Sequence, residues 1–283
     1  MKLIVIADIH SNHIALESAI KMIDEINPDG IIFLGDYVTD CPYPQKTMKL
    51  LYLCIENYQC WFIRGNREDY LLNHQKNPND GWCYSSSVGS LLYTYENLTK
   101  DDLRFFADMP LCRDIEINGS PVITACHSSP ASTTEWIKDK PELLDKYIGE
   151  IKGDILLCGH THRIGLYRNH DKTVLFCPSF GLPQDMNSDA RFTVLELMDG
   201  KWSYKMLSIE IDIERLISEF EESGLSNKAP VWSRTIIKLL IEKRDAPMQC
   251  VSLAWDKAKA DNYSGGTILP EAYWNEAAKE LGI

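Results

Sequence analysis

Residues 154–162 read Asp-Ile-Leu-Leu-Cys-Gly-His-Thr-His. The four residues at 155–158 predict a short buried strand, and the glycine that follows predicts its end. His160 and His162 come next, in a loop from which both imidazoles can face one site. Imidazole is the commonest transition-metal ligand among side chains, so the pair indicates a metal site, with a surface loop as the alternative interpretation. The other strands of the chain decide between the two.

Four other apolar runs also end in polar residues that can bind metals. These residues are Asp8 and His10 after 3–7, Asp36 after 31–34, Asn66 after 60–63, and His127 after 121–126. Each has an ordinary explanation of its own: helix caps for the aspartates, a turn for the asparagine and a core position for the histidine. Separate explanations do not account for the fact that four of the seven histidines follow strand ends. Because the carboxyl ends of parallel strands meet at one edge of an open sheet, we expect one site there.

The composition limits the classes of binding partner and indicates the cellular compartment. A net charge of −12 argues against binding a nucleic-acid polymer or an anionic membrane, but it permits a small phosphorylated substrate held by cations. The nine cysteines include no Cys-x-x-Cys pair, which predicts free thiols and a reducing compartment. No apolar segment approaches the roughly 18 residues of a membrane span, so we expect a cytoplasmic protein.

The order of apolar runs and helical patterns predicts how the chain is organised. Strand and helix patterns alternate over 1–63, which indicates an α/β fold with a mainly parallel sheet. Residues 70–110 predict a helical and irregular insertion near the site. A second sheet is predicted from the apolar or alternating segments at 166–168, 173–177, 191–197 and 202–209.

From about residue 210 onward the sequence predicts helices without intervening strands. The amphipathic patterns cover 211–221, 231–243 and 273–281. We therefore expect a main domain at 1–207 and a C-terminal helical extension at 208–283. The extension either packs on the main domain or forms a subunit contact in a homodimer.

The candidate ligands are numerous enough for two cations. Seven oxygen and nitrogen ligands, with one carboxylate shared, can hold two cations about 3.5–4 Å apart, and such a pair holds a hydroxide and clamps a phosphoryl group for in-line attack. A mixed set of carboxylate, amide and imidazole favours Mn, Fe or Zn over Ca or Mg. We expect two divalent or trivalent transition-metal ions, with manganese effective in vitro.

The motifs resemble, in their order, those of the calcineurin-like metallophosphoesterases. They are Asp8-x-His10, Gly35-Asp36, Gly65-Asn66, His127 and Gly159-His160-Thr161-His162, and the segment 178–183 resembles the Pro-Gly-Ser-Val-Gly segment of the family. The spacing within 1–207 is similar to the small bacterial and archaeal phosphodiesterase branch, which includes members like the asymmetric dinucleoside tetraphosphate hydrolases. The resemblance implies a four-layer α/β/β/α sandwich and a dinuclear site. It implies one metal on Asp8, His10, Asp36 and His162, and another on Asp36, Asn66, His127 and His160.

One position departs from the family pattern. Many members carry a histidine directly after the Gly-Asn pair, where this chain has Arg67. A guanidinium cannot act as a general acid at neutral pH, but it can hold a phosphate oxygen and stabilise transition-state charge. Unactivated alkyl monoesters should therefore be the poorest substrates. The catalytic residues that we expect are Asp36, Arg67 and His127, and the substrate contacts are Asn12, His13, Asn66 and Arg67. His13 is a candidate substitute acid, with a solvated helix residue as its ordinary interpretation.

These observations predict a metal-dependent phosphohydrolase that uses a metal-bridging hydroxide to cleave a phosphodiester or phosphoanhydride. Dinucleoside polyphosphates and small phosphodiesters are the expected substrates. Two alternatives stay open: a phosphoprotein phosphatase, and a non-catalytic module that binds a partner through residues 208–283. The aromatic residues Trp82, Tyr84, Tyr93 and Tyr95 either stack on a nucleobase or pack in the core.

Overall fold

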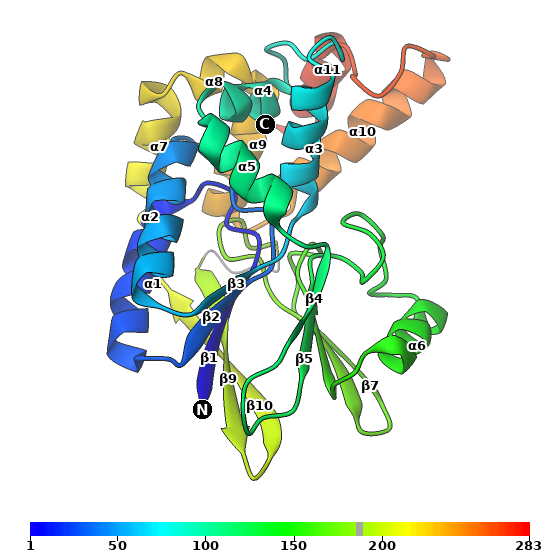
Figure 1. The fold of residues 1–283 in the computed structure, drawn as a ribbon. Helices are drawn as coiled ribbons and strands as arrows, with labels where there is room; N and C mark the ends of the chain where they lie inside the picture. The colour runs from blue at the N-terminus through cyan, green and yellow to red at the C-terminus, as the bar shows by residue number, and fades with distance from the viewer. Residues whose placement is uncertain (185–188) are drawn as a thin grey trace.

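The computed structural model describes residues 1–184 and 189–283. Within these residues, the strands form two five-stranded sheets, which stand side by side in Figure 1. The first sheet has the order β10-β9-β1-β2-β3. Its strands are β1 (Lys2–Ile6), β2 (Gly30–Phe33), β3 (Cys60–Phe62), β9 (Ala190–Met198) and β10 (Lys201–Ile209). Strands β1, β2 and β3 are parallel, and β9 runs antiparallel to β1 and β10.

The second sheet has the order β4-β5-β6-β8-β7. Its strands are β4 (Cys112–Ile115), β5 (Ile123–Cys126), β6 (Ile155–Cys158), β7 (Gly165–Asn169) and β8 (Lys172–Phe176). Strands β5, β6 and β8 are parallel, and β4 and β7 form antiparallel edges. Within each sheet, the central parallel strands therefore end at the same edge.

The predicted distribution of strands between the sheets was wrong in two respects. Residues 191–197 and 202–209 were expected in the second sheet, but β9 pairs with β1, where Val194 lies opposite Ile4. Strands β5 and β6, which were expected to share one sheet edge with β1, form the second sheet instead. Alternating or apolar patterns show that a strand is buried, but they do not identify its neighbours. The predicted ligands consequently come from two sheets.

The sheets pack face to face, and helices cover their outer faces. Leu3 and Val5 point into the core between the sheets, whereas Ile4 and Ile6 point to the opposite face, as strand alternation requires. The helices α1 (His13–Ile26) and α2 (Pro44–Asn57) cover the first sheet, and α6 (Pro141–Glu150) covers the second (Figure 1). The predicted four-layer α/β/β/α sandwich is confirmed.

The remaining helices gather beyond one end of the sheets, and we call them the helical cap (Figure 1). They are α3 (Asn66–Lys76), α4 (Gly89–Glu96), α5 (Lys100–Asp108), α7 (Ile213–Glu222), α8 (Leu225–Lys228), α9 (Pro230–Glu242), α10 (Ala246–Ala260) and α11 (Glu271–Leu281). Phe220 and Leu239 join the core that covers the first sheet, while α10 and α11 pack around Trp274 in a smaller cluster. The C-terminal helices thus pack on the rest of the chain.

Strand β10 continues to Ile209, so the last strand of the first sheet passes the predicted domain limit at residue 207. The division of the chain into domains at 1–207 and 208–283 stays a prediction. None of the helices in the described ranges is long and apolar enough to cross a lipid bilayer. All nine cysteines are free thiols, and the Sγ atoms of Cys126 and Cys158 lie 3.5 Å apart in the core.

Candidate metal centre

Five of the predicted ligands adopt a left-handed backbone conformation. Their φ angles are 56° for Asp8, 50° for His10, 54° for Asp36, 62° for His160 and 55° for His162. Residues other than glycine rarely adopt this conformation, which costs about 1–3 kcal/mol each and concentrates at functional sites. The conformation occurs directly after β1, β2 and β6, where the chain turns sharply at the strand end. The backbone therefore directs these side chains toward one place.

Asp8, His10, Asp36 and His162 form the first group of ligand atoms, which all lie within 4.8 Å of one another. Nε2 of His10 lies 3.0 Å from Nε2 of His162, which in turn lies 3.5 Å from Oδ1 of Asp8. Asp8 and His10 follow β1 and Asp36 follows β2, whereas His162 follows β6 of the second sheet. The group therefore joins the ends of both sheets.

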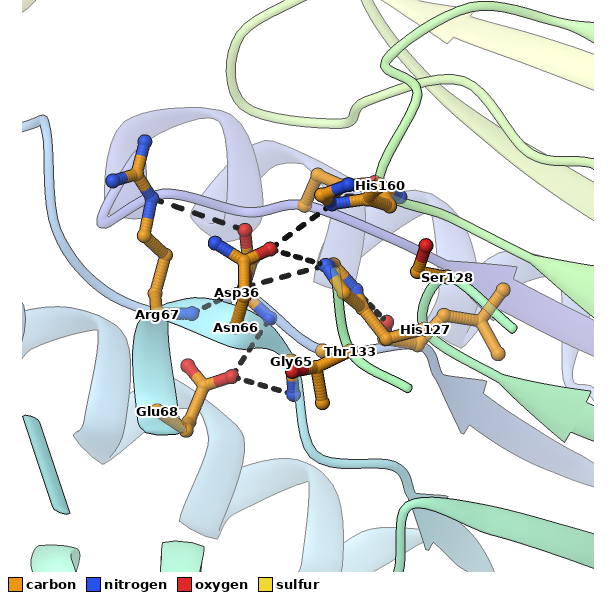
Figure 2. A network of polar contacts seen from close by, with 12 residues as sticks. Asp36, Gly65, Asn66, Arg67, Glu68, His127, Ser128, Thr133 and His160 are labelled. Atoms are coloured by element: carbon orange, nitrogen blue, oxygen red, sulfur yellow. Dashed lines mark hydrogen bonds and ion pairs between the residues drawn. The ribbon is translucent and has the colours of Figure 1, made fainter. Parts of the chain in front are cut away.

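Asn66, His127 and His160 form a second group, which lies beside Asp36 of the first (Figure 2). Oδ1 of Asn66 lies 3.0 Å from Nε2 of His127 and 3.0 Å from Nδ1 of His160. Asp36 faces both groups with different oxygens: Oδ2 lies 3.8 Å from Nε2 of His10, and Oδ1 lies 3.5 Å from Nε2 of His127. The structure thus brings all seven predicted ligands together, with Asp36 between the two groups.

Backbone carbonyls fix the orientation of two of the imidazoles. Nδ1 of His127 lies 2.7 Å from the carbonyl oxygen of Leu34, and Nδ1 of His162 lies 3.2 Å from that of Leu182. A carbonyl oxygen only accepts, so each ring carries its proton on Nδ1 and presents the lone pair of Nε2 to the centre. This is the tautomer that a metal ligand requires.

The electrostatic environment fits cations. Burial lowers the pKa values of His127 and His162, and burial with His127 lowers the pKa of His160 to about 4, so these imidazoles are neutral and keep a free lone pair. Burial and then Asp36 raise the pKa of Asp8. Burial also raises the pKa of Asp36, but His127, His10 and Arg67 outweigh it and lower the value. Buried carboxylates beside neutral imidazoles form a donor set that a transition-metal ion would neutralise and complete.

Sequence reasoning missed Asp40, which contacts three side chains at the centre. Oδ2 of Asp40 lies 2.9 Å from Nδ1 of His10 and 3.1 Å from Nη2 of Arg67. Oδ1 accepts a 2.8 Å hydrogen bond from Nε1 of Trp232 on α9. Asp40 therefore links a predicted ligand, the predicted phosphate-binding arginine and the C-terminal helices. Its position four residues after Asp36 was the only local signal.

Glu68 was also missed, and it holds the backbone of two motifs. Its carboxylate accepts three hydrogen bonds of 2.9 Å from the backbone nitrogens of Asp36, Tyr37 and Gly65. Figure 2 shows the bonds from Asp36 and Gly65. The ends of β2 and β3 are thereby tied together. Gly65 is required at this junction, because an added Cβ would overlap the carboxylate and the backbone nitrogen of Asp36.

Two predicted substrate contacts lie apart from the other site residues. Asn12 caps α1, accepting from the backbone nitrogen of Ala15 at 3.1 Å and donating to the carbonyl of Gly181 at 3.0 Å. His13 is fully buried, so its interpretation as a solvated helix residue is wrong, and its Nε2 lies 3.2 Å from Oε2 of Glu219 on α7. In the described part of the chain, neither side chain lines the cavity at the metal centre.

The aromatic residues at 82–95 pack among themselves and their neighbours. Trp82 stacks on His74 with ring centroids 4.1 Å apart, and Tyr95 meets the same imidazole edge-to-face. Tyr93 is buried, and the hydroxyl of the exposed Tyr84 donates to Glu96. These contacts favour the packing interpretation over stacking on a nucleobase.

A cavity of about 380 Å³ opens beside the seven residues. Asn66, Arg67, His160 and His162 line one side of it, and 12% of the His162 side chain is exposed there. Residues from α9 and α10, among them Trp232, line another side. The metal centre is therefore accessible through a concave pocket that the C-terminal helices help to form.

Residues 1–163 match the family model described as calcineurin-like phosphoesterase. This chain belongs to that family. Among its relatives, the uncharacterized protein MJ0912 of Methanocaldococcus jannaschii is 26% identical over 245 residues, which span 81% of this chain and 93% of the relative. Family membership and the buried Asp/His cluster together support a metal-dependent phosphoesterase.

Two crystal structures show the same fold as this calcineurin-like phosphoesterase. A metallophosphoesterase from Sphaerobacter thermophilus superposes with a TM-score of 0.67 at 20% identity, covering 86% of this chain and 99% of its own. The hypothetical protein PH1004 from Pyrococcus horikoshii gives a TM-score of 0.71 at 19% identity, covering 84% and 97%. Each match covers more of the chain than residues 1–207 alone provide, so it includes part of the C-terminal helices.

Proposed function

We propose that this protein is a dinuclear, metal-dependent hydrolase that cleaves a phosphodiester or phosphoanhydride bond in a nucleotide substrate. The position of Asp36 carries the proposal. Its two carboxylate oxygens face different groups of ligand atoms, at 3.8 Å from His10 and 3.5 Å from His127. One carboxylate between two such groups is what a pair of cations with a shared bridging ligand requires.

The proposed ligands divide into two sets that share Asp36. The first set adds Asp8, His10 and His162, and the second adds Asn66, His127 and His160. Mixed carboxylate, amide and imidazole donors favour Mn, Fe or Zn, and we choose manganese for reconstitution. Bound cations of this kind act as Lewis acids at phosphoryl oxygens and lower the pKa of water to near neutrality.

Arg67 is the side chain that we expect to contact the phosphoryl oxygens. It lines the cavity, and 22% of its side chain is exposed. Burial alone lowers the pKa of Arg67, but Asp40 and Asp36 raise it above its ordinary value, so the guanidinium stays charged. A permanent cation stabilises charge on phosphoryl oxygens but donates no proton to the leaving oxygen. Substrates that release a phosphate or a nucleotide therefore fit this site best.

The shape of the cavity supports a small substrate over a phosphoprotein. Its volume of about 380 Å³ is in the range of small-molecule sites, and Trp232 and Met248 of the C-terminal helices form part of its wall. Trp136, which is 40% exposed, lies at its rim with its ring centroid 6.3 Å from that of His160. An exposed indole beside a phosphate site offers a face on which a nucleobase can stack.

The test is product analysis with manganese-loaded protein and diadenosine tetraphosphate, comparing wild type with Asp36→Ala. We expect ATP plus AMP from wild type, since attack at an end phosphate gives unequal products. Two ADP molecules would place the attack at the middle of the polyphosphate chain. We expect the variant to lose at least about 10³-fold in rate while its circular dichroism is unchanged. Activity on phosphopeptides alone would support a phosphoprotein phosphatase, and no hydrolysis of any phosphoester would overturn the proposal.

A further inference from the structure

A second cavity, of about 260 Å³, lies between α4 and the C-terminal helices. Three of the seven tryptophans of the chain line it: Trp232 of α9, Trp255 of α10 and Trp274 of α11. We call it the tryptophan cavity. Its remaining wall includes the hydroxyl-bearing Ser87 and Ser90, so the lining is aromatic and polar together.

The tryptophan cavity adjoins the cavity at the metal centre. Asp40, Arg67, Trp232 and Met248 line both. Arg67 therefore stands at the junction, with the metal centre on one side and the tryptophan cavity on the other. A substrate whose phosphate lies against Arg67 and the metal centre can extend its next group into the tryptophan cavity.

Two of the indoles are fixed before any ligand arrives. Nε1 of Trp274 donates a 2.7 Å hydrogen bond to Oγ of Ser87, and Nε1 of Trp232 donates a 2.8 Å bond to Oδ1 of Asp40. The two rings meet edge-to-face with centroids 6.1 Å apart. Trp255, which is half-buried on α10, contributes a third ring to the same lining. Rings held in this way lose little conformational entropy when a planar group stacks against them.

We propose that the tryptophan cavity is a subsite for a nucleobase of the substrate. The proposal rests on the proposed function, because it assigns the part of the substrate that extends beyond Arg67. Indole faces bind planar π-systems. The hydroxyl of Ser87 is used within the protein, since it accepts from Trp274 and donates to the carbonyl of Leu269. Base contacts at the edge therefore fall to Ser90 and Thr267. The subsite also gives the C-terminal helices a role that the sequence left open.

The experiment compares two ligands that share a sugar phosphate and differ only in the base. Adenosine 5′-monophosphate and ribose 5-phosphate are titrated into manganese-loaded wild type and into Trp255→Ala by isothermal calorimetry. Stacking on one aromatic side chain is worth a factor of about 5 to 150 in affinity, so wild type should prefer the adenosine ligand by at least about fivefold. Trp255→Ala should bring this ratio close to one without changing the affinity for ribose 5-phosphate.

Two control variants separate the base contact from general damage. Trp255→Phe keeps an aromatic ring and should retain most of the preference. Trp82→Ala removes a half-buried indole that lines neither cavity and should leave both affinities unchanged. Equal binding of the two ligands to wild type, or a preference that survives Trp255→Ala, overturns the subsite.

The outcomes also separate this inference from the proposed function. If the protein hydrolyses diadenosine tetraphosphate but shows no base preference, the proposed subsite is refuted and the proposed hydrolase function is supported. A base preference that Trp255→Ala abolishes, in a protein that hydrolyses no phosphoester, would support the subsite and overturn the hydrolase.

Discussion

Replacing Asp40 with asparagine should weaken both the fold and the metal centre, because one carboxylate serves four partners: His10, Arg67, Trp232 and the hydroxyl of Thr39, which donates to Oδ2 at 3.1 Å. Oδ2 lies 2.9 Å from Nδ1 of His10 and 3.1 Å from Nη2 of Arg67, while Oδ1 accepts a 2.8 Å bond from Nε1 of Trp232. Although burial raises the pKa of Asp40, Arg67 and His10 hold it well below its ordinary range. The group is therefore ionised at neutral pH, and the substitution removes a charge.

The magnitude follows from what an asparagine can replace. If its oxygen faces His10 and Arg67, its amide nitrogen faces the indole N–H of Trp232, and a hydrogen bond worth about 1 kcal/mol is lost. The charge is lost in either orientation, and a hydrogen bond to a charged group is worth about 1.5–3 kcal/mol. Because 22% of the Arg67 side chain is exposed to the cavity, water offsets part of this loss. We expect the free energy of unfolding to fall by about 2–4 kcal/mol.

Manganese affinity should fall as well, by a factor of about 10 to 100, because His10 loses the carboxylate that orients it. Urea unfolding of metal-free protein measures the first effect, and isothermal calorimetry with manganese measures the second. Trp232→Phe is the matched control, since it removes the same indole bond and keeps the charge of Asp40. It should cost about 1 kcal/mol and lower the manganese affinity by much less than Asp40→Asn does. Equal effects of the two substitutions on metal affinity would refute the reasoning.

Two further predictions concern His160 and Gly65. Burial and His127 lower the pKa of His160 to about 4, below its unfolded value of about 6.5, so the unfolded chain takes up the proton first. Stability is therefore lost as pH falls from about 6.5 toward 4, and metal-free wild type should lose about 2 kcal/mol more than His160→Asn between about pH 7.5 and pH 5 in urea titrations. An equal loss in both proteins would contradict this. Gly65→Ala should abolish manganese binding in calorimetry, because its Cβ would overlap Asp36, whereas Gly149→Ala, with nothing within 4 Å of the added atom, should bind normally.

The fold was predictable wherever local patterns carry the information. Apolar runs that stop at glycine or aspartate located the central strands, and the resemblance supplied the arrangement of four layers. The pairing of β9 with β1 was not predictable from pattern, because Ile4 and Val194 are 190 residues apart and both are simply buried. The helices α6 and α10 were also not delimited, although both carry start signals that could have located them: Pro141 opens α6, and Asp245 caps α10 with Pro247 in its first turn.

The site shows the same division between local and long-range information. The seven proposed ligands follow strand ends directly, so the sequence pattern was sufficient to identify them. Asp40 and Glu68 were missed because only their contacts reveal their roles. Asp40 contacts Trp232, which is 192 residues away in the sequence. Glu68 contacts backbone nitrogens, which no side-chain pattern reveals. His13 illustrates the opposite error, since its nearness to His10 in sequence suggested a shared site, whereas its side chain faces Glu219 on α7. The left-handed backbone of the ligand residues likewise has no local signature.

Arg67, Asp40 and the C-terminal helices depend on one another. A permanent cation whose Nε lies 3.9 Å from Oδ2 of Asp36 repels any cation that Asp36 holds. The carboxylate of Asp40 offsets that charge at 3.1 Å, and it is itself held in place by Trp232 from α9. The buried carboxylate therefore reduces the repulsion between the arginine and a cation at Asp36, and a C-terminal helix donates a hydrogen bond to that carboxylate. The helix α9, which lines the tryptophan cavity through Trp232, thus also donates the hydrogen bond to the carboxylate that balances the charge of Arg67.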